Sequence, residues 1–231
     1  MFDHPPPLGI LMLDTNFPRI VGDGGNPASY PYPTIVRRVA GADVDRAVRG
    51  DPRSLLDLFV SEGRGLVEDG CCAIITTCGF LAPLQDVLSA ALPVPIATSA
   101  LLECARVQRR LSEGRVAVLT IAASALTRDH LDAARVPDET PIGTLEGGTF
   151  ARSILGNAPT LDVEAARAEH VAAARMLVAE HPATRAIVLE CANMPPYADD
   201  IAAATGLPVH SVLTMAHRLR DGAIRSLGVA H

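Results

Sequence analysis

The chain of 231 residues carries 26 acidic and 20 basic side chains, which gives a net charge of −6 and an isoelectric point near 5.6. Such a chain has no overall positive field to hold a nucleic acid or an anionic membrane, so we expect a small-molecule ligand instead. All 20 basic side chains are arginines, because the sequence contains no lysine. The absence of lysine excludes a Schiff base to pyridoxal phosphate or to a carbonyl substrate, and it excludes the phosphate-binding lysine of a P-loop.

The composition, 48% hydrophobic and 20% charged, is that of a folded globular protein with one large or two small domains. The apolar run 8–13 near the start of the chain is too short to span a membrane, and no basic region precedes it as in a signal peptide. The cysteines form neither a disulfide-rich framework nor a zinc-binding spacing. They are Cys71, Cys72, Cys78, Cys104 and Cys191. We therefore expect a cytoplasmic protein with no metal site.

Short apolar runs rich in β-branched residues alternate along the chain with longer segments of helical periodicity. The predicted strands are residues 8–13, 34–39, 72–77, 94–97, 115–121, 141–145, 185–190 and 208–210. The predicted helices are residues 55–68, 83–92, 99–111, 124–134, 163–180 and 199–205. This alternation is typical of parallel sheets that are covered by helices and joined by right-handed crossovers. The predicted fold class is therefore α/β.

The two halves of the chain repeat a similar order of predicted elements. A buried-strand pattern ends at Cys78 in the first half and at Cys191 in the second, about half the chain length later. Each cysteine precedes a segment that turns into a helix at a proline, which favours the first helical turn. Ligands of open α/β sheets bind beyond the carboxyl ends of the strands, so both cysteines are expected where a ligand would bind.

Two thiols at such positions suggest acid–base chemistry. A thiol near a helix N-terminus is expected to have its pKa lowered from about 8.5 to between about 3.5 and 7.5. If the two thiols face each other, one removes a proton from a stereocentre while the other donates a proton to the opposite side, which inverts the centre without a cofactor. The simpler interpretation is that cysteine is a small buried hydrophobe, and we assign that structural role to Cys71, Cys72 and Cys104.

Three local sequences resemble the aspartate/glutamate/hydantoin racemase superfamily. They are residues 13–19 (LDTNFPR), 76–82 (TTCGFLA) and 189–197 (LECANMPPY), and the resemblance extends over essentially the whole chain. It is strongest to a poorly characterised branch in which the long segment 14–33 recurs. The resemblance implies two pseudosymmetric domains, each a parallel sheet flanked by helices, with the active site in the cleft between them. We place the first domain at residues 1–97 plus 211–231 and the second at residues 98–210.

The resemblance also implies racemisation by two cysteines without a cofactor. It assigns Cys78 and Cys191 as the catalytic pair. Asp14 and Thr15 match an Asp-Ser pair that follows the first strand of glutamate racemases, and Thr120 matches a threonine in a loop that lines the pocket.

The residues after each cysteine depart from the pattern of glutamate racemases, which read Cys-Asn-Thr in the first half and Cys-Thr-His in the second. Here Cys78 is followed by Gly79 and Phe80, and Cys191 by Ala192 and Asn193. The side chains that bind the substrate carboxylate are therefore missing, and the backbone amides of these four residues are expected to bind it instead. Glutamate itself is a poor fit. The stretch 193–195 is also similar to maleate isomerases of the same superfamily, in which one cysteine is the nucleophile.

Two further features lie near these motifs. The long segment 16–33, with four prolines, is a candidate lid over the cleft, and Arg19 within it could bind a second carboxylate. Glu190 directly precedes Cys191, but strand alternation predicts that the two side chains point to opposite faces, so we do not assign Glu190 to the site.

The leading hypothesis is a racemase or epimerase of an amino acid or related small carboxylate, with Cys78 and Cys191 as opposed acid and base. One alternative is a lyase or cis-trans isomerase of a small dicarboxylate that uses mainly Cys191. The other is a non-catalytic protein that binds a small carboxylate. Racemases of this superfamily are often oligomers, so by analogy we expect a homo-oligomer.

Overall fold

The computed structural model describes residues 5–226, which form two four-stranded sheets. Residues 1–4 and 227–231, which the first predicted domain includes, lie outside the described residues. The strands are β1 (Leu8–Leu13), β2 (Thr34–Val39), β3 (Ala73–Thr76), β4 (Ile96–Ala97), β5 (Arg115–Thr120), β6 (Ile142–Thr144), β7 (Thr184–Leu189) and β8 (Val209–His210). All eight predicted strands are present, with shifts of one or two residues at most ends.

Each sheet is parallel throughout. The first has the order β2-β1-β3-β4 and the second the order β6-β5-β7-β8, so the two halves repeat one topology. The central strands β1, β3, β5 and β7 are almost entirely buried, as expected of parallel strands that are covered on both faces. The predicted α/β class, with two sheets flanked by helices, is confirmed.

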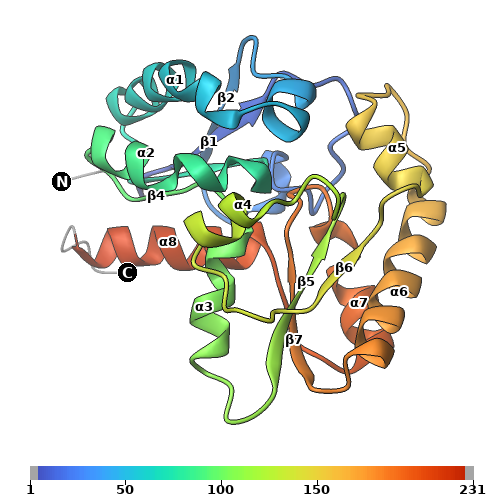
Figure 1. The fold of residues 1–231 in the computed structure, drawn as a ribbon. Helices are drawn as coiled ribbons and strands as arrows, with labels where there is room; N and C mark the ends of the chain where they lie inside the picture. The colour runs from blue at the N-terminus through green and yellow to red at the C-terminus, as the bar shows by residue number, and fades with distance from the viewer. Residues whose placement is uncertain (1–4, 227–231) are drawn as a thin grey trace.

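Eight α-helices cover these sheets in the described residues. They are α1 (Leu56–Glu68), α2 (Gln85–Ala91), α3 (Glu103–Gln108), α4 (Arg128–Ala133), α5 (Thr149–Leu155), α6 (Val163–Glu180), α7 (Ala198–Thr205) and α8 (Val212–Ser226). Figure 1 shows α8 below β1 and β2, and α3 on the opposite side of β5 and β7 from α6 and α7. In the first sheet α1 packs against β1 and β2, and α2 packs against β4. Neither α5 nor α8 is among the predicted helices.

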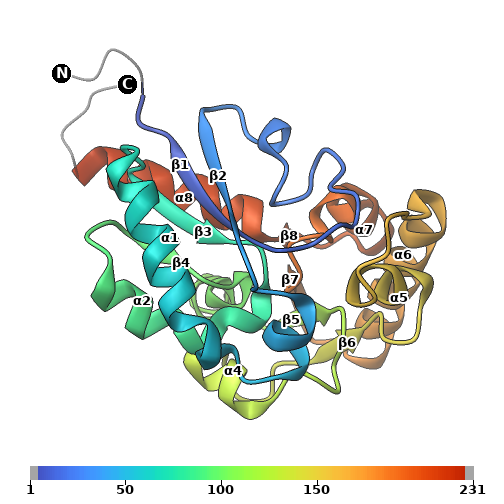
Figure 2. The same ribbon diagram turned by 90° about the horizontal axis from the view of Figure 1, so that it is seen from above.

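The last helix returns to the first sheet. Although α8 follows β8 of the second sheet, it packs against β3 and β4 of the first, and its buried side chains include Met215 and Ala216. Figure 2 shows α8 beside β3 at the same end of the molecule as β1. The domain boundaries at residues 97 and 210 stay a prediction. Within residues 5–226, no helix has both the length and the apolar composition that a membrane crossing requires.

Candidate active site

Both predicted cysteines lie just beyond the carboxyl ends of central strands. Cys78 follows β3 by two residues and Cys191 follows β7 by two residues, and both thiols line one buried cavity of about 30 Å³ between the sheets. The lining comprises Leu13, Phe17, Val44, Val48, Thr77, Cys78, Gly79, Phe80, Ile121, Ile154, Leu155, Glu190, Cys191 and Asn193. Ligand sites of α/β proteins are found at this end of the strands.

Cys78 is the N-cap of a short 3₁₀ helix, Gly79–Leu84, and has an extended backbone with φ −147° and ψ 118°. The Cys78 side chain makes no capping hydrogen bond, but the nearby backbone N–H groups of Phe80 and Leu81 act with Arg19 to lower the pKa of its thiol. Burial has a larger effect and raises the pKa of Cys78 to about 12. The position at a helix start predicts a lowered pKa, and the direction is the opposite because the thiol is buried away from water.

Cys191 begins a tight turn in which the Met194 N–H donates to the Cys191 carbonyl at 3.1 Å. Its thiol donates to Asn193 Oδ1 at 3.4 Å, and the Asn193 side-chain amide donates to Asp23. Burial, together with the negative charge of neighbouring Glu190, raises the pKa of the Cys191 thiol well above its usual value. The nearby Cys78 thiol and Asp23 also raise this pKa, by smaller amounts.

Glu190 is the site residue that strand alternation assigned to the wrong face. The strand ends at Leu189, so the alternation of side chains does not continue through Glu190 and Cys191, and both line the cavity. Thr120 Oγ1 donates to Glu190 Oε2 at 2.9 Å, while Glu190 Oε1 is buried with no hydrogen-bond partner. Burial raises the pKa of Glu190 to about 7.

Gly79 makes room for the Glu190 carboxyl. A Cβ atom at Gly79 would lie 2.1 Å from Glu190 Oε1 and 2.6 Å from the Glu190 carbonyl oxygen. The glycine that replaces the Asn of the Cys-Asn-Thr pattern therefore lets a carboxyl group from the second sheet reach the loop after Cys78.

Gly79→Ala is expected to lower the melting temperature and the free energy of unfolding by about 1 to 3 kcal/mol, because the added methyl group overlaps Glu190 and its backbone. Thermal unfolding measures the effect. The matched control is Gly222→Ala in α8, where an added Cβ meets no atom within 4 Å and is expected to leave stability unchanged or raised. Equal unfolding curves for both variants would contradict the close approach at Gly79.

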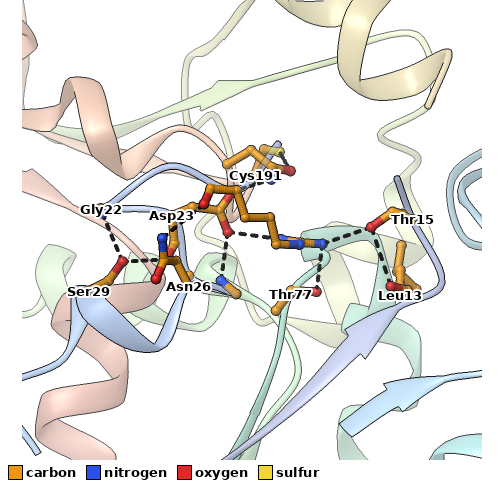
Figure 3. Close-up of polar contacts among 12 residues, drawn as sticks. Leu13, Thr15, Gly22, Asp23, Asn26, Ser29, Thr77 and Cys191 are labelled. Carbon is orange, nitrogen blue, oxygen red and sulfur yellow. Dashed lines mark hydrogen bonds and ion pairs between the residues drawn. The ribbon is translucent and has the colours of Figure 1, made fainter. Parts of the chain in front are cut away.

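The segment 16–33 connects the end of β1 with the loop after Cys191 (Figure 3). Arg19 Nη2 donates to Thr15 Oγ1 at 3.3 Å and to Thr77 Oγ1 at 3.5 Å, and Arg19 Nη1 pairs with Asp23 Oδ1 at 2.9 Å. Arg19 thus pairs with Asp23, a carboxylate of the protein itself, and not with the second substrate carboxylate that the sequence left open for it.

The same segment packs on the second sheet's loop. The Gly24 N–H donates to the Ala192 carbonyl at 2.9 Å, and the Gly22 backbone lies against Pro196. Phe17 contributes a wall of the cavity. A role of this segment as a moving lid stays a prediction.

The other predicted site residues fall into two groups. Gly79, Phe80 and Asn193 line the cavity with the cysteines, whereas Asp14, Thr15, Thr120 and Ala192 are not in its lining. Asp14 is half exposed and pairs with Arg38 at 3.3 Å. Thr15 is buried and accepts from Arg19, Thr120 holds Glu190 in place, and Ala192 is buried against the segment 16–33.

The cavity is mainly hydrocarbon. Its ionisable groups are Cys78, Cys191 and Glu190, and no arginine or histidine is among the residues that line it. Within residues 5–226, no three His, Cys, Asp or Glu side chains gather as metal ligands would. The polar chemistry available at the cavity is therefore that of two thiols, one carboxyl group, two polar side chains (Thr77 and Asn193) and the loop amides.

Solved structures with the same fold include several enzymes. Unliganded arylmalonate decarboxylase has a TM-score of 0.58 with 17% identity, covering 98% of this chain and 94% of that chain. Allantoin racemase from Pseudomonas fluorescens has a TM-score of 0.61 with 16% identity, covering 96% and 92%. Glutamate racemase from Thermus thermophilus has a TM-score of 0.56 with 17% identity, covering 98% and 83%. The chain therefore has the two-domain Asp/Glu racemase fold, which confirms the fold that the sequence resemblance implies.

Sequence relatives carry a different activity in their names. A dimethylsulfoniopropionate lyase from Durusdinium sp. clade D is 27% identical over 217 residues, covering 90% of this chain and 72% of the relative. Dimethylsulfoniopropionate lyase 7 from Emiliania huxleyi is 28% identical over 222 residues, covering 90% and 64%. Further relatives of this name are longer, and across the relatives that it matches the chain spans 44% to 72% of their lengths. No family model matches the chain.

Proposed function

We propose that this chain is a lyase that removes the α-proton of a small carboxylate and expels a cationic leaving group from the β-carbon. The observation that carries the proposal is the cavity lining, which offers two thiols and one carboxyl group and no basic side chain. Such a lining suits a substrate with one carboxylate and one positive charge better than a dicarboxylate. The relatives named dimethylsulfoniopropionate lyase support this substrate class.

The reaction needs only a base and a site that binds the substrate with its α-proton next to that base. In dimethylsulfoniopropionate, the α-carbon next to the carboxylate bears acidic hydrogens, and the β-carbon bears the dimethylsulfonium group. A thiolate takes an α-proton, the electron pair of the C–H bond forms the carbon–carbon double bond, and the C–S bond breaks with its electrons on sulfur. The products are acrylate and dimethyl sulfide, and the proton on the thiol returns to solvent. The step balances without oxidant, reductant or cofactor, which suits a chain that has no lysine.

Cys78 is the thiol best placed to act as the base. The backbone N–H groups of Phe80 and Leu81 and the nearby Arg19 all lower the pKa of its thiol, which favours the thiolate. Glu190 raises the pKa of both thiols, but the Cys191 thiol also donates its proton to Asn193 and has the charge of Asp23 nearby, which favours its protonated form. The lyase alternative from sequence assigned the chemistry mainly to Cys191, and these contacts favour Cys78.

The cavity is small for such a substrate. A volume of about 30 Å³ holds about one water molecule, so dimethylsulfoniopropionate enters only when the walls move apart. Ile154 and Leu155 of α5 and Phe17 of the segment 16–33 form part of those walls. Movement of these elements is part of the proposed catalytic cycle.

Racemisation is the second candidate, because two thiols line one cavity and the fold is shared with racemases. It differs from elimination in that both thiols are needed equally, one on each side of the substrate.

One experiment separates the two functions. The protein is incubated in deuterated water with dimethylsulfoniopropionate, and separately with single enantiomers of amino acids, while NMR follows acrylate, dimethyl sulfide and α-deuterium. The lyase predicts acrylate and dimethyl sulfide in equal amounts. Deuteration of an amino acid with loss of optical purity, and no acrylate, would instead support racemisation.

A further inference from the structure

Three carboxyl side chains are buried in residues 5–226, and one of them has no cationic partner. Asp23 pairs with Arg19 at 2.9 Å. Glu103, fully buried, pairs with Arg106 and Arg218. Glu190, 1% exposed, makes no ion pair within the described part of the chain, and only its Oε2 accepts a hydrogen bond. A buried carboxylate without a partner is costly, so its retention suggests that the partner comes from outside the protein.

The geometry around Glu190 is that of a binding site rather than of a packing defect. Thr120 on the neighbouring strand fixes one carboxyl oxygen, and Gly79 leaves the space that the other oxygen occupies. The free Oε1 belongs to a side chain that lines the cavity together with Phe17 and Phe80, and the Phe17 ring already attracts one cation, the Arg19 guanidinium, 4.9 Å from its centroid. A carboxylate in a mainly apolar cavity suits an alkylated cation, because its charge attracts the cation and the apolar walls accommodate the alkyl groups.

We propose that Glu190 and Gly79 form a cation subsite, in which Glu190 Oε1 pairs with the sulfonium or alkylammonium group of the substrate. This inference rests on the proposed function, since it names the residue that binds the leaving group of the elimination. It assigns Glu190 to substrate binding, next to the thiol that removes the proton.

Pairing with the cation also affects the thiols. The charge of Glu190 raises the pKa of both Cys78 and Cys191. A bound cation offsets this charge and adds its own positive field, so the thiolate becomes easier to form when the correct substrate is present. A carboxylate of the same shape that lacks the cationic group leaves the thiols protonated. The subsite therefore couples recognition of the leaving group to activation of the base.

The test compares two ligands of equal shape that differ in charge. The probes are the zwitterion 3-(trimethylammonio)propanoate and its isostere 4,4-dimethylpentanoate, in which an uncharged tert-butyl group replaces the trimethylammonium group, with affinities measured by titration calorimetry at pH 8. The wild-type protein is expected to bind the cation at least about tenfold more tightly. The Glu190→Gln variant is expected to bind the two probes about equally tightly. The matched control Glu103→Gln removes a buried charge outside the cavity and is expected to keep the preference.

A second measurement uses the wild-type protein alone. The preference for the cation is expected to grow from pH 5 to pH 8, because Glu190 ionises with a pKa of about 7. The neighbouring thiols Cys78 and Cys191 stay protonated over this range, and His130, whose ring contacts Phe80, has its pKa lowered by burial.

Two results would overturn the subsite: no preference for the cation in the wild type, or an undiminished preference in Glu190→Gln. Failure of the proposed function is a separate result. A cation preference that depends on Glu190, without formation of acrylate, leaves the subsite standing and removes the elimination. Acrylate formation together with an unchanged preference in Glu190→Gln leaves the elimination standing and removes the subsite.

Discussion

Cys78→Ser is expected to lower the rate of acrylate formation by a factor on the order of 10² to 10⁴, the usual contribution of a positioned general base. A serine hydroxyl at this position is too weakly acidic to form the anion that removes the α-proton. Cys191→Ser keeps a hydrogen-bond donor to Asn193 and is expected to lower the rate by less than about tenfold. Initial rates of dimethyl sulfide release measure both effects.

The matched control is Cys104→Ser, because Cys104 is fully buried and outside the cavity lining. This variant is expected to lose stability but to keep the rate per folded molecule. Equal and complete loss of activity in Cys78→Ser and Cys191→Ser would contradict the single-base elimination and would support the two-base racemase. Loss of the rate in Cys191→Ser alone would show that Cys191, and not Cys78, is the base.

Glu190→Gln is expected to make the protein more stable at pH 8, by about 3 kcal/mol, and to leave stability nearly unchanged at pH 4.5. The carboxyl has a pKa of about 7 in the folded protein and about 4.5 when exposed, so the folded state binds its proton more tightly. The stability that Glu190 contributes is therefore complete below pH 4.5 and is lost as the pH rises through 7. Glutamine is neutral throughout and avoids this loss.

Chemical denaturation at a series of pH values measures the difference between the wild type and the Glu190→Gln variant. Glu103→Gln is the control of opposite sign, because Glu103 has two arginine partners and its neutralisation is expected to cost about 2 kcal/mol at pH 8. A Glu190→Gln protein that is less stable than the wild type at pH 8 would show that the carboxylate is satisfied in the free protein.

Local patterns predict most of the fold. The buried strands β1, β3, β5 and β7 are short runs of β-branched and aliphatic residues, and parallel pairing buries them on both faces. The placement of Cys78 and Cys191 follows from where these runs end. The helix α8 also carries a local signal that was overlooked, since the Ser211 hydroxyl accepts the Leu213 N–H at its start.

Tertiary contacts decide what the sequence does not predict. The first turn of α5 is capped by Glu169 from α6, whose carboxylate accepts the N–H groups of Thr149 and Phe150 at 2.6 and 2.9 Å. No local sequence pattern contains that cap. The orientation of Glu190 depends likewise on where β7 ends and on the space left by Gly79 in the other half. The raised pKa values of the thiols follow from burial, which a position at a helix start does not reveal.

The most direct test of the account is the rate of a single turnover with dimethylsulfoniopropionate that carries deuterium at both α-positions, with the enzyme in excess. If the thiol of Cys78 removes an α-proton as the leaving group departs, the deuterated substrate forms acrylate severalfold more slowly than the unlabelled substrate. Equal single-turnover rates for the two substrates would contradict proton removal by the buried thiol as the step that drives elimination.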